Sequence, residues 1–424
     1  MNKQSPKLAA LGVAIALATG TASAVEGPVP TGIPKLDHVY VIVMENQAYG
    51  QIIDNPNMAW TNQWAHSANL ATKYYAIAHP SLTNYLEMVG GSNFGVLNDN
   101  GPDWHNASCS PNLATAVAST DNPYVAAAIC PIGGTGTEAA TPAIDTSNEA
   151  QGAPGDINID GTASFPAMNN ISGKSIADQL VARGKRWKTY QESLPLRGAD
   201  GVNSSDGVYD NTTDFSAITP TLTPPLTSAS LVNLYAAKHN PFAYFASTQH
   251  NASPNNGLGW TTMSGFDGAH GLYADLRAMW GPSLSFIVPN QCNDQHGRGN
   301  AGAFCNYNPS ENGQQSGTNP ALIHAGDVAL QKIVTSIKSS PSWNVGRNAI
   351  VVVWDENDYA HSPVANQVVA IVDTNYGPKG VKSSQFYTHY SLLKTLEAGL
   401  GLPCLNHACD SNVKVMSDLF GGAQ

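Results

Sequence analysis

The sequence is poor in charged residues, and basic residues are the scarcer kind. Only 12% of its 424 residues are charged, and 20 Lys and Arg stand against 31 Asp and Glu, which gives a formal net charge of −11. A chain with this balance offers little of the cationic surface that binds nucleic acids or anionic membranes. We therefore expect neither of these as a partner.

Long apolar runs are absent as well. None reaches the roughly 18 apolar residues that a membrane-spanning helix needs. The apolar run at residues 8–18 follows Lys3 and Lys7 and precedes small residues that end at Ala24, an order typical of a secretory signal peptide. We predict a signal peptide over residues 1–24 and a single domain over residues 25–424 in the periplasm or outside the cell. Without Lys3 and Lys7 the net charge becomes −13.

Cysteine is infrequent, and no C-x-x-C spacing indicates a zinc site. An even number of cysteines in an exported chain favours disulfides over thiolate ligation of a metal. Three pairs would each close a short local loop. We therefore predict the bonds Cys109–Cys130, Cys292–Cys305 and Cys404–Cys409.

Short apolar runs alternate with segments of helical spacing. We predict strands at residues 39–44, 187–191, 241–247, 284–289, 349–354 and 367–373. We predict helices at residues 175–184, 325–336 and 390–399. This alternation favours an α/β fold with a largely parallel sheet that helices cover on both faces.

Two long stretches break the alternation. Residues 131–170 and 196–228 are rich in Gly, Ala, Thr, Asn, Asp and Pro. Loops of this length are usually functional or disordered, and we interpret them as excursions that cover the mouth of a site. The segment DINIDG at residues 156–161 resembles the first half of a calcium loop. Its twelfth position is Ala167 instead of Glu, which favours an Asx-rich turn.

Two of the predicted strands end in carboxylates. VYVIVMEN ends in Glu45 and Asn46, and AIVVVWDEN places Asp355 and Glu356 before its last residue. Ligands bind at the carboxyl ends of parallel strands in α/β sheets, and carboxylates gathered there repel unless a cation lies between them. For either strand alone, a carboxylate that caps the next turn is the simpler interpretation.

A third predicted strand adds an oxygen and a nitrogen ligand. SLSFIVPNQCNDQHG, residues 283–297, places Asp294 and His296 just after the strand. An Asp-x-His pair suits zinc, iron or manganese better than calcium. Surface loops often contain such a pair, so it is weak evidence by itself. Together, the three strand ends predict a site for a divalent metal ion.

The segment HPSLTNYLEMVGG, residues 79–91, holds a candidate nucleophile. Pro80 and Ser81 look like the start of a helix. A serine there lies beside backbone N–H groups and the positive end of the helix dipole, which suits a phosphoryl group. Asn84, one turn further on, could donate to a phosphate oxygen. From this segment alone, the commoner role of a plain N-cap is favoured for Ser81.

Five motifs together resemble a known family. They are HVYVIVMENQAYGQII, HPSLTNYLEMVGGSNFGV, SFIVPNQCNDQHG, NAIVVVWDEN and FYTHYSLLKTLEAGLGLP, in this order. The set is similar to the phosphoesterase family of acid phosphatases and phospholipases C, in the alkaline phosphatase-like superfamily. The resemblance implies a three-layer α/β sandwich with a central, mostly parallel sheet and a serine or threonine nucleophile beside metal.

The resemblance also implies roles for single residues. Ser81 matches the nucleophile and Asn84 a phosphate-binding Asn, while His296 and His389 match residues that bind a second metal or protonate the leaving oxygen. One or two divalent ions are implied, without a choice among zinc, manganese, iron and calcium. The implied metal ligands are Glu45, Asn46, Ser81, Asp294, His296, Asp355, Glu356 and His389.

The sequence departs from the phospholipase members of that family. They continue after the late acidic pair with Gly-Gly and then Asp-His, whereas this chain reads DENDYAHS. The form HPSLTNY is closer to the phosphatase members. His79 and His105 are further candidates for a general acid or a substrate contact, and either could equally be an ordinary surface residue.

These observations predict an exported, metal-dependent phosphoric ester hydrolase of the acid phosphatase type. Its substrate would be a small phosphate ester or a phospholipid head group. A phospholipase C or another phosphodiesterase could use the same site, and a non-catalytic exported binding protein is a further alternative. A serine esterase ranks last, because the sequence contains no G-x-S-x-G elbow.

Overall fold

The computed structural model describes residues 26–94, 96, 171, 173–194, 213–219, 234–249, 255–259, 261–278, 281–297, 304–305, 319–357 and 366–422, with four further short strands. Several predictions fall outside these residues. They concern the signal peptide at residues 1–24, Cys109, His105, DINIDG and most of the two long loops. The division into a signal peptide and one domain over residues 25–424 stays a prediction.

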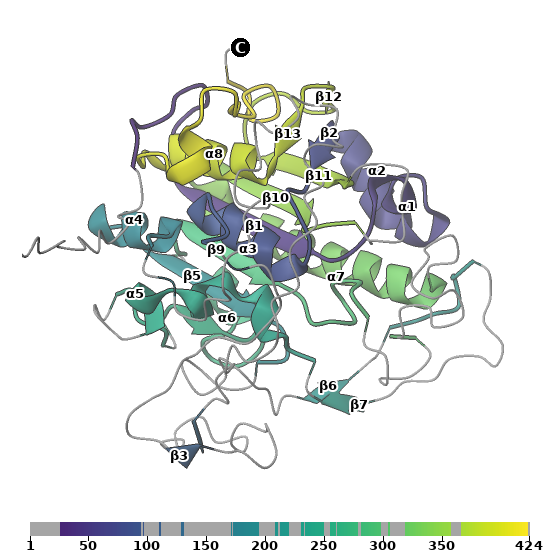
Figure 1. Cartoon of the computed structure of the whole chain (residues 1–424). Helices are drawn as coiled ribbons and strands as arrows, with labels where there is room; N and C mark the ends of the chain where they lie inside the picture. Colours follow the sequence, from purple (N-terminus) through teal and green to yellow (C-terminus); the bar gives the residue numbers. More distant parts are fainter. Residues whose placement is uncertain are drawn as a thin grey trace, which may run out of the picture.

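One large sheet organises the described residues. Its strand order is β12–β2–β11–β10–β1–β9–β5–β8, and β13 also pairs with β2 (Figure 1). Every pairing in it is parallel except the two that β11 makes, with β10 and with β2. Its strands are β1 (His38–Met44), β2 (Asn69–Tyr75), β5 (Trp187–Gln191), β8 (Met263–Ser264), β9 (Leu284–Val288), β10 (Asn348–Trp354), β11 (Gln367–Thr374), β12 (Lys382–Ser383) and β13 (Tyr387–Thr388).

Two further sheets have two strands each. They are β3 (Ser110–Pro111) with β4 (Ile129–Cys130), and β6 (Val208–Asp210) with β7 (Ser230–Val232). The α-helices are α1 (Tyr49–Ile52), α2 (Ala59–Ser67), α3 (Ser81–Gly90), α4 (Ile176–Ala182), α5 (Ala246–Gln249), α6 (Leu272–Arg277), α7 (Pro320–Lys338) and α8 (His389–Leu400). The 3₁₀ helices are η1 (Pro56–Met58), η4 (Ala237–His239), η5 (Pro241–Tyr244), η8 (Ser342–Asn344) and η9 (Asn406–Cys409).

The central strands are buried on both faces. All seven residues of β10 are buried although successive side chains point to opposite faces. The helices that provide this cover form two groups, α3 with α4 and α8, and α7 with α2 and α6 (Figure 1). Continuous Val and Ile runs are expected where a parallel sheet has helices on both sides. The predicted α/β fold with a mostly parallel sheet is confirmed.

Most predicted elements are present, with one clear error. Five of the six predicted strands occur within a residue or two of the predicted bounds, and the three predicted helices overlap α4, α7 and α8. Residues 241–247 are wrong as a strand, because they form η5 and the start of α5. A short apolar run can form a buried helical turn as readily as a buried strand. Pro241 suits the first position of a helix.

Two of the predicted disulfides are confirmed, Cys292–Cys305 and Cys404–Cys409. Cys109 lies outside the described residues, so the third pair stays a prediction. The Cys292–Cys305 bond closes a loop that contains Asp294 and His296. Among the described residues, no helix combines the length and the apolar character that crossing a membrane requires.

Candidate active site

The carboxyl ends of the parallel strands bring the predicted acidic residues to one edge of the sheet. β1 lies between β10 and β9, so Glu45 follows the central strand of the three. Backbone bonds continue past the strand ends, from Glu45 N to the Asp294 carbonyl at 2.8 Å and from Asp355 N to the Met44 carbonyl at 2.9 Å. The carboxylates of three strands are therefore held beside one another by main-chain pairing.

Ser81 faces two of these carboxylates. Its Oγ lies 3.2 Å from Glu45 Oε2 and 3.1 Å from Glu356 Oε1, and its side chain is almost fully buried. The N-cap of α3 is Pro80, and Ser81 is the first helical residue. The hydroxyl is thus directed at the carboxylates instead of capping the helix. Because a hydroxyl carries one hydrogen, Ser81 can donate to only one of the two oxygens at a time.

Four carboxylates are buried in this cluster. Glu45, Asp294 and Asp355 are 0% exposed and Glu356 is 4% exposed. Burial is the main cause that raises the pKa of Glu45 and Asp294 well above the ordinary range, and the charge of Asp355 adds to it. Burial and the Glu356 carboxylate raise the pKa of Asp355 to about 8. The protein alone therefore disfavours full ionisation of this cluster.

The backbone is left-handed at two positions beside these carboxylates. Asn46 has φ of 51° and Gln295 has φ of 79°. The Asn46 N–H donates to Asp355 Oδ1 at 3.1 Å, and the Gln295 side chain accepts from the Trp354 indole N–H at 2.9 Å. Such conformations are costly for residues other than Gly and concentrate at functional sites. Asn46 directly follows Glu45 in the chain, and Gln295 directly follows Asp294.

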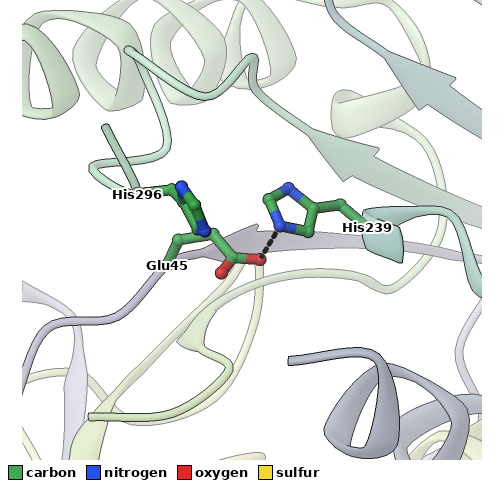
Figure 2. A group of neighbouring side chains, drawn as sticks. All are labelled: Glu45, His239 and His296. Atoms are coloured by element: carbon green, nitrogen blue, oxygen red, sulfur yellow. Dashed lines mark ion pairs between the residues drawn. The ribbon is translucent and has the colours of Figure 1, made fainter. Parts of the chain in front are cut away.

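A second set of side chains lies on the other oxygen of Glu45. Oε1 of Glu45 accepts a short hydrogen bond from the Tyr85 hydroxyl and lies 3.2 Å from His239 Nε2. His239 Nδ1 lies 3.3 Å from Asp294 Oδ2. Ligand atoms of Glu45, His239 and His296 all lie within 4.8 Å of one another (Figure 2). We call the Ser81 surroundings the serine side of Glu45, and this set the histidine side.

Sequence reasoning did not identify three residues of the site. His239 and Lys238 belong to η4, just before the segment that was predicted as a strand, and no spacing in AAKHNPF indicates a ligand. Tyr85 lies in α3, one helical turn after Ser81. Its ring stacks on the His239 ring with 5.4 Å between centroids. In the sequence, only the position of Tyr85 one helical turn after Ser81 could have indicated that it belongs to the site.

Asn84 fixes the conformation of the loop that precedes Ser81. Its side-chain oxygen accepts from the N–H groups of Ile77 and Ala78 at 3.0 and 3.1 Å. Its amide donates to the Ala78 carbonyl at 2.7 Å and to Glu356 Oε2 at 3.0 Å. Both amide hydrogens are therefore used by the protein. The predicted phosphate contact of Asn84 stays a prediction, and these bonds favour a positioning role.

His389 and His79 contact the late acidic pair, Asp355 and Glu356. His389 Nε2 lies 2.6 Å from the Asp355 carbonyl, and Tyr74 OH lies 3.0 Å from His389 Nδ1. Burial lowers the pKa of His389 to about 4. Both ring nitrogens are engaged, so metal ligation by His389 stays a prediction that these contacts do not favour. His79 Nδ1 lies 2.9 Å from Glu356 Oε2.

The donor set fits a divalent cation. Among the described residues, the buried side-chain atoms without a hydrogen-bond partner include Asp355 Oδ2, Asp294 Oδ2 and His239 Nε2. Buried polar atoms are normally paired, and carboxylate oxygens with imidazole nitrogens are ligands of zinc, iron and manganese. A cation at Glu45 would offset the carboxylates and explain the absent partners.

Comparison with curated proteins gives relatives that are named as phosphatases. An acid phosphatase of Aspergillus fumigatus is 24% identical over 379 residues, which cover 88% of this chain and 57% of that protein. A phosphate-repressible acid phosphatase of Penicillium chrysogenum is 24% identical over 96% of this chain and 74% of its own length. A phosphatidylinositol-3-phosphatase of Mycobacterium tuberculosis is 26% identical over 93% of this chain and 86% of its own length. The chain spans little more than half of the Aspergillus relative.

Comparisons with solved structures and with family profiles give structural neighbours and a family. A protein of the alkaline phosphatase superfamily from Vibrio parahaemolyticus aligns with a TM-score of 0.43 and 12% identity over 89% of this chain and 69% of its own. The profile of the Phosphoesterase family matches residues 54–403, a range that includes Ser81, Asp294, Asp355 and Glu356 and begins after Glu45. This match covers most of the chain, which therefore belongs to the Phosphoesterase family.

Proposed function

We propose that this protein is a metal-dependent phosphomonoesterase that uses Ser81 as its nucleophile. The observation that carries the proposal is the Ser81 hydroxyl between Glu45 and Glu356, at the first residue of α3 and within a cluster of buried carboxylates. Membership of the Phosphoesterase family and relatives named as acid phosphatases support the reaction class. Export of the chain is part of the proposal and rests on the sequence of residues 1–24.

Glu45, Asp355 and Glu356 would hold a divalent ion on the serine side, and Asn46, next to Glu45 in the chain, is a further candidate ligand. When bound, the ion supplies a Lewis acid that lowers the pKa of the Ser81 hydroxyl. Asp355 Oδ2 has no hydrogen-bond partner and is available to it. Tyr85 and the Asn46 N–H hold the remaining oxygens of Glu45 and Asp355 in place.

The serine side can then carry out an in-line displacement at phosphorus. Ser81 Oγ forms a bond to phosphorus while the bond to the leaving oxygen breaks, and the hydroxyl proton passes to a carboxylate within hydrogen-bond distance, Glu45 or Glu356. The N-terminus of α3, with its positive dipole end, lies beside the phosphoryl oxygens. Water then hydrolyses the phosphoserine, which releases phosphate and restores Ser81.

The test compares three substrates with and without a chelator. The purified protein would be assayed on p-nitrophenyl phosphate, on bis-p-nitrophenyl phosphate and on phosphatidylcholine, beside Ser81→Ala. Ser67→Ala is a matched control, because Ser67 is exposed near the end of α2 and bonds only locally, to the Trp64 carbonyl. Loss of the nucleophile should reduce monoester turnover by about three orders of magnitude or more, while the control keeps the wild-type rate.

Each other result would replace part of the proposal. Preferential cleavage of the diester or the lipid would make the protein a phosphodiesterase or phospholipase C. Activity that resists chelation would remove the metal from the mechanism. Turnover that survives Ser81→Ala would show that another residue is the nucleophile. No turnover of any substrate with added zinc, manganese, iron or calcium would favour the non-catalytic binding protein.

A further inference from the structure

The histidine side of Glu45 is built around lone pairs. His296 Nδ1 lies 2.7 Å from the Gly297 carbonyl, so this nitrogen carries the hydrogen and Nε2 carries the lone pair. His239 lies between two carboxylates, with its Nδ1 3.3 Å from Asp294 Oδ2 and its Nε2 3.2 Å from Glu45 Oε1. Figure 2 shows both rings directed at the Glu45 carboxylate.

This convergence requires a positive charge. The His296 Nε2 lone pair and the Glu45 carboxylate belong to a group of ligand atoms that all lie within 4.8 Å of one another, and electron-rich atoms this close repel unless a cation lies among them. His239 Nε2 is fully buried and has no hydrogen-bond partner. A second metal ion is one candidate for this position.

The chain itself contributes a cation here. Lys238 precedes His239 in η4, and its Nζ lies 3.2 Å from His296 Nε2, where it can donate to the ring lone pair. The positive charge of Lys238 acts on Glu45 and Asp294, whose pKa values it lowers against the larger effect of burial. Lys238 is only half-buried. Its ammonium can therefore reach the histidine side without the full cost of burying a charge.

We propose that the ammonium of Lys238 takes the place of a second metal ion on the histidine side, so that the protein binds one divalent ion per chain. The inference rests on the proposed function, which places that ion on the serine side. While His296 Nε2 accepts from Lys238, the same lone pair does not ligate a metal. The lysine supplies one fixed positive charge beside Glu45, and this charge stays when metal is scarce.

Metal content decides the question independently of turnover. Wild-type protein, Lys238→Met and Lys238→Arg would be equilibrated with excess zinc, and separately with manganese, then freed of unbound metal and analysed by inductively coupled plasma mass spectrometry. We expect one equivalent in the wild type, two in Lys238→Met and one in Lys238→Arg, which keeps a cation. Lys73→Met is the matched control, because it removes one exposed lysine charge on β2 and should leave one equivalent.

The outcomes separate this inference from the proposed function. Two equivalents in the wild type, or one in a folded Lys238→Met, would overturn the role of Lys238 and leave the metal-dependent Ser81 mechanism intact. Absence of metal from every variant would overturn the metal of the proposed function and the inference with it. If Lys238→Met does not fold, the wild-type stoichiometry still decides, and His239→Ala should leave it at one equivalent.

Discussion

Replacement of Asp355 by Asn is expected to stabilise the metal-free protein while it abolishes hydrolysis. Asp355 is fully buried, and burial followed by the Glu356 charge raises its pKa to about 8. Its Oδ1 accepts the Asn46 N–H at 3.1 Å, which an Asn oxygen would retain, whereas Oδ2 has no hydrogen-bond partner. Asn therefore keeps the positioning contact and removes the charge.

The magnitude follows from proton linkage. In the unfolded chain the carboxyl ionises near 3.8, its ordinary pKa. With a raised pKa in the folded state, its contribution to stability is fully present below pH 3.8 and is lost progressively as the pH rises to about 8. About three pH units separate 3.8 from neutrality, and each corresponds to about 1.4 kcal/mol, so the carboxyl costs about 4 kcal/mol at pH 7.

Urea unfolding in a chelator, measured at about pH 5 and about pH 7, tests this reasoning. We expect Asp355→Asn to be more stable than the wild type by up to about 4 kcal/mol at neutral pH, and by less at acidic pH. Added zinc or manganese should stabilise only the wild type, since binding to the folded state raises its stability. Asp54→Asn, at an exposed left-handed position, should change stability by at most about 0.5 kcal/mol. An Asp355→Asn protein that is less stable than the wild type in chelator, or a difference independent of pH, would refute the argument.

Three further changes test the supports of the site and of the fold. Tyr85→Phe removes the hydrogen bond to Glu45 and should weaken metal binding by about 10- to 100-fold in calorimetric titration, with an unchanged circular dichroism spectrum. Gln295→Ala leaves the Trp354 indole N–H without its acceptor and should lower the unfolding free energy by at least about 1–3 kcal/mol in urea; equal stability would contradict this. Two lysines and an indole hold the pKa of Asp373 below its usual range against the effect of burial. Wild-type stability should therefore fall as the pH decreases through that pKa, and Asp373→Asn should remove this dependence in unfolding curves recorded between about pH 6 and about pH 2.

The strands at the centre of the sheet could be predicted from local sequence. The runs that became β1, β9, β10 and β11 consist largely of Val, Ile and other apolar residues, a composition expected of strands that are covered on both faces. β2 was missed, because NLATKYY mixes Asn, Thr and Lys with its apolar residues. Its place beside β11 depends on pairing with a segment about 300 positions later.

The acidic half of the site was predictable for a topological reason. Parallel neighbours in one sheet end at the same edge, so carboxylates that follow β1 and β10 must meet. The motif of Ser81 added a helix start, and the structure places its hydroxyl between Glu45 and Glu356.

The sequence by itself determined the class of fold, the strands at its centre and the gathering of carboxylates at one edge, since these depend on local periodicity and on the rule that parallel strands end together. Only the tertiary structure decided which side chains complete the site. Lys238 and His239 come from a short turn almost 200 positions after Glu45. They reach Glu45 through the packing of η4 against α3. Long-range packing of this kind leaves no periodic trace in the chain, because it depends on how distant segments fold against one another.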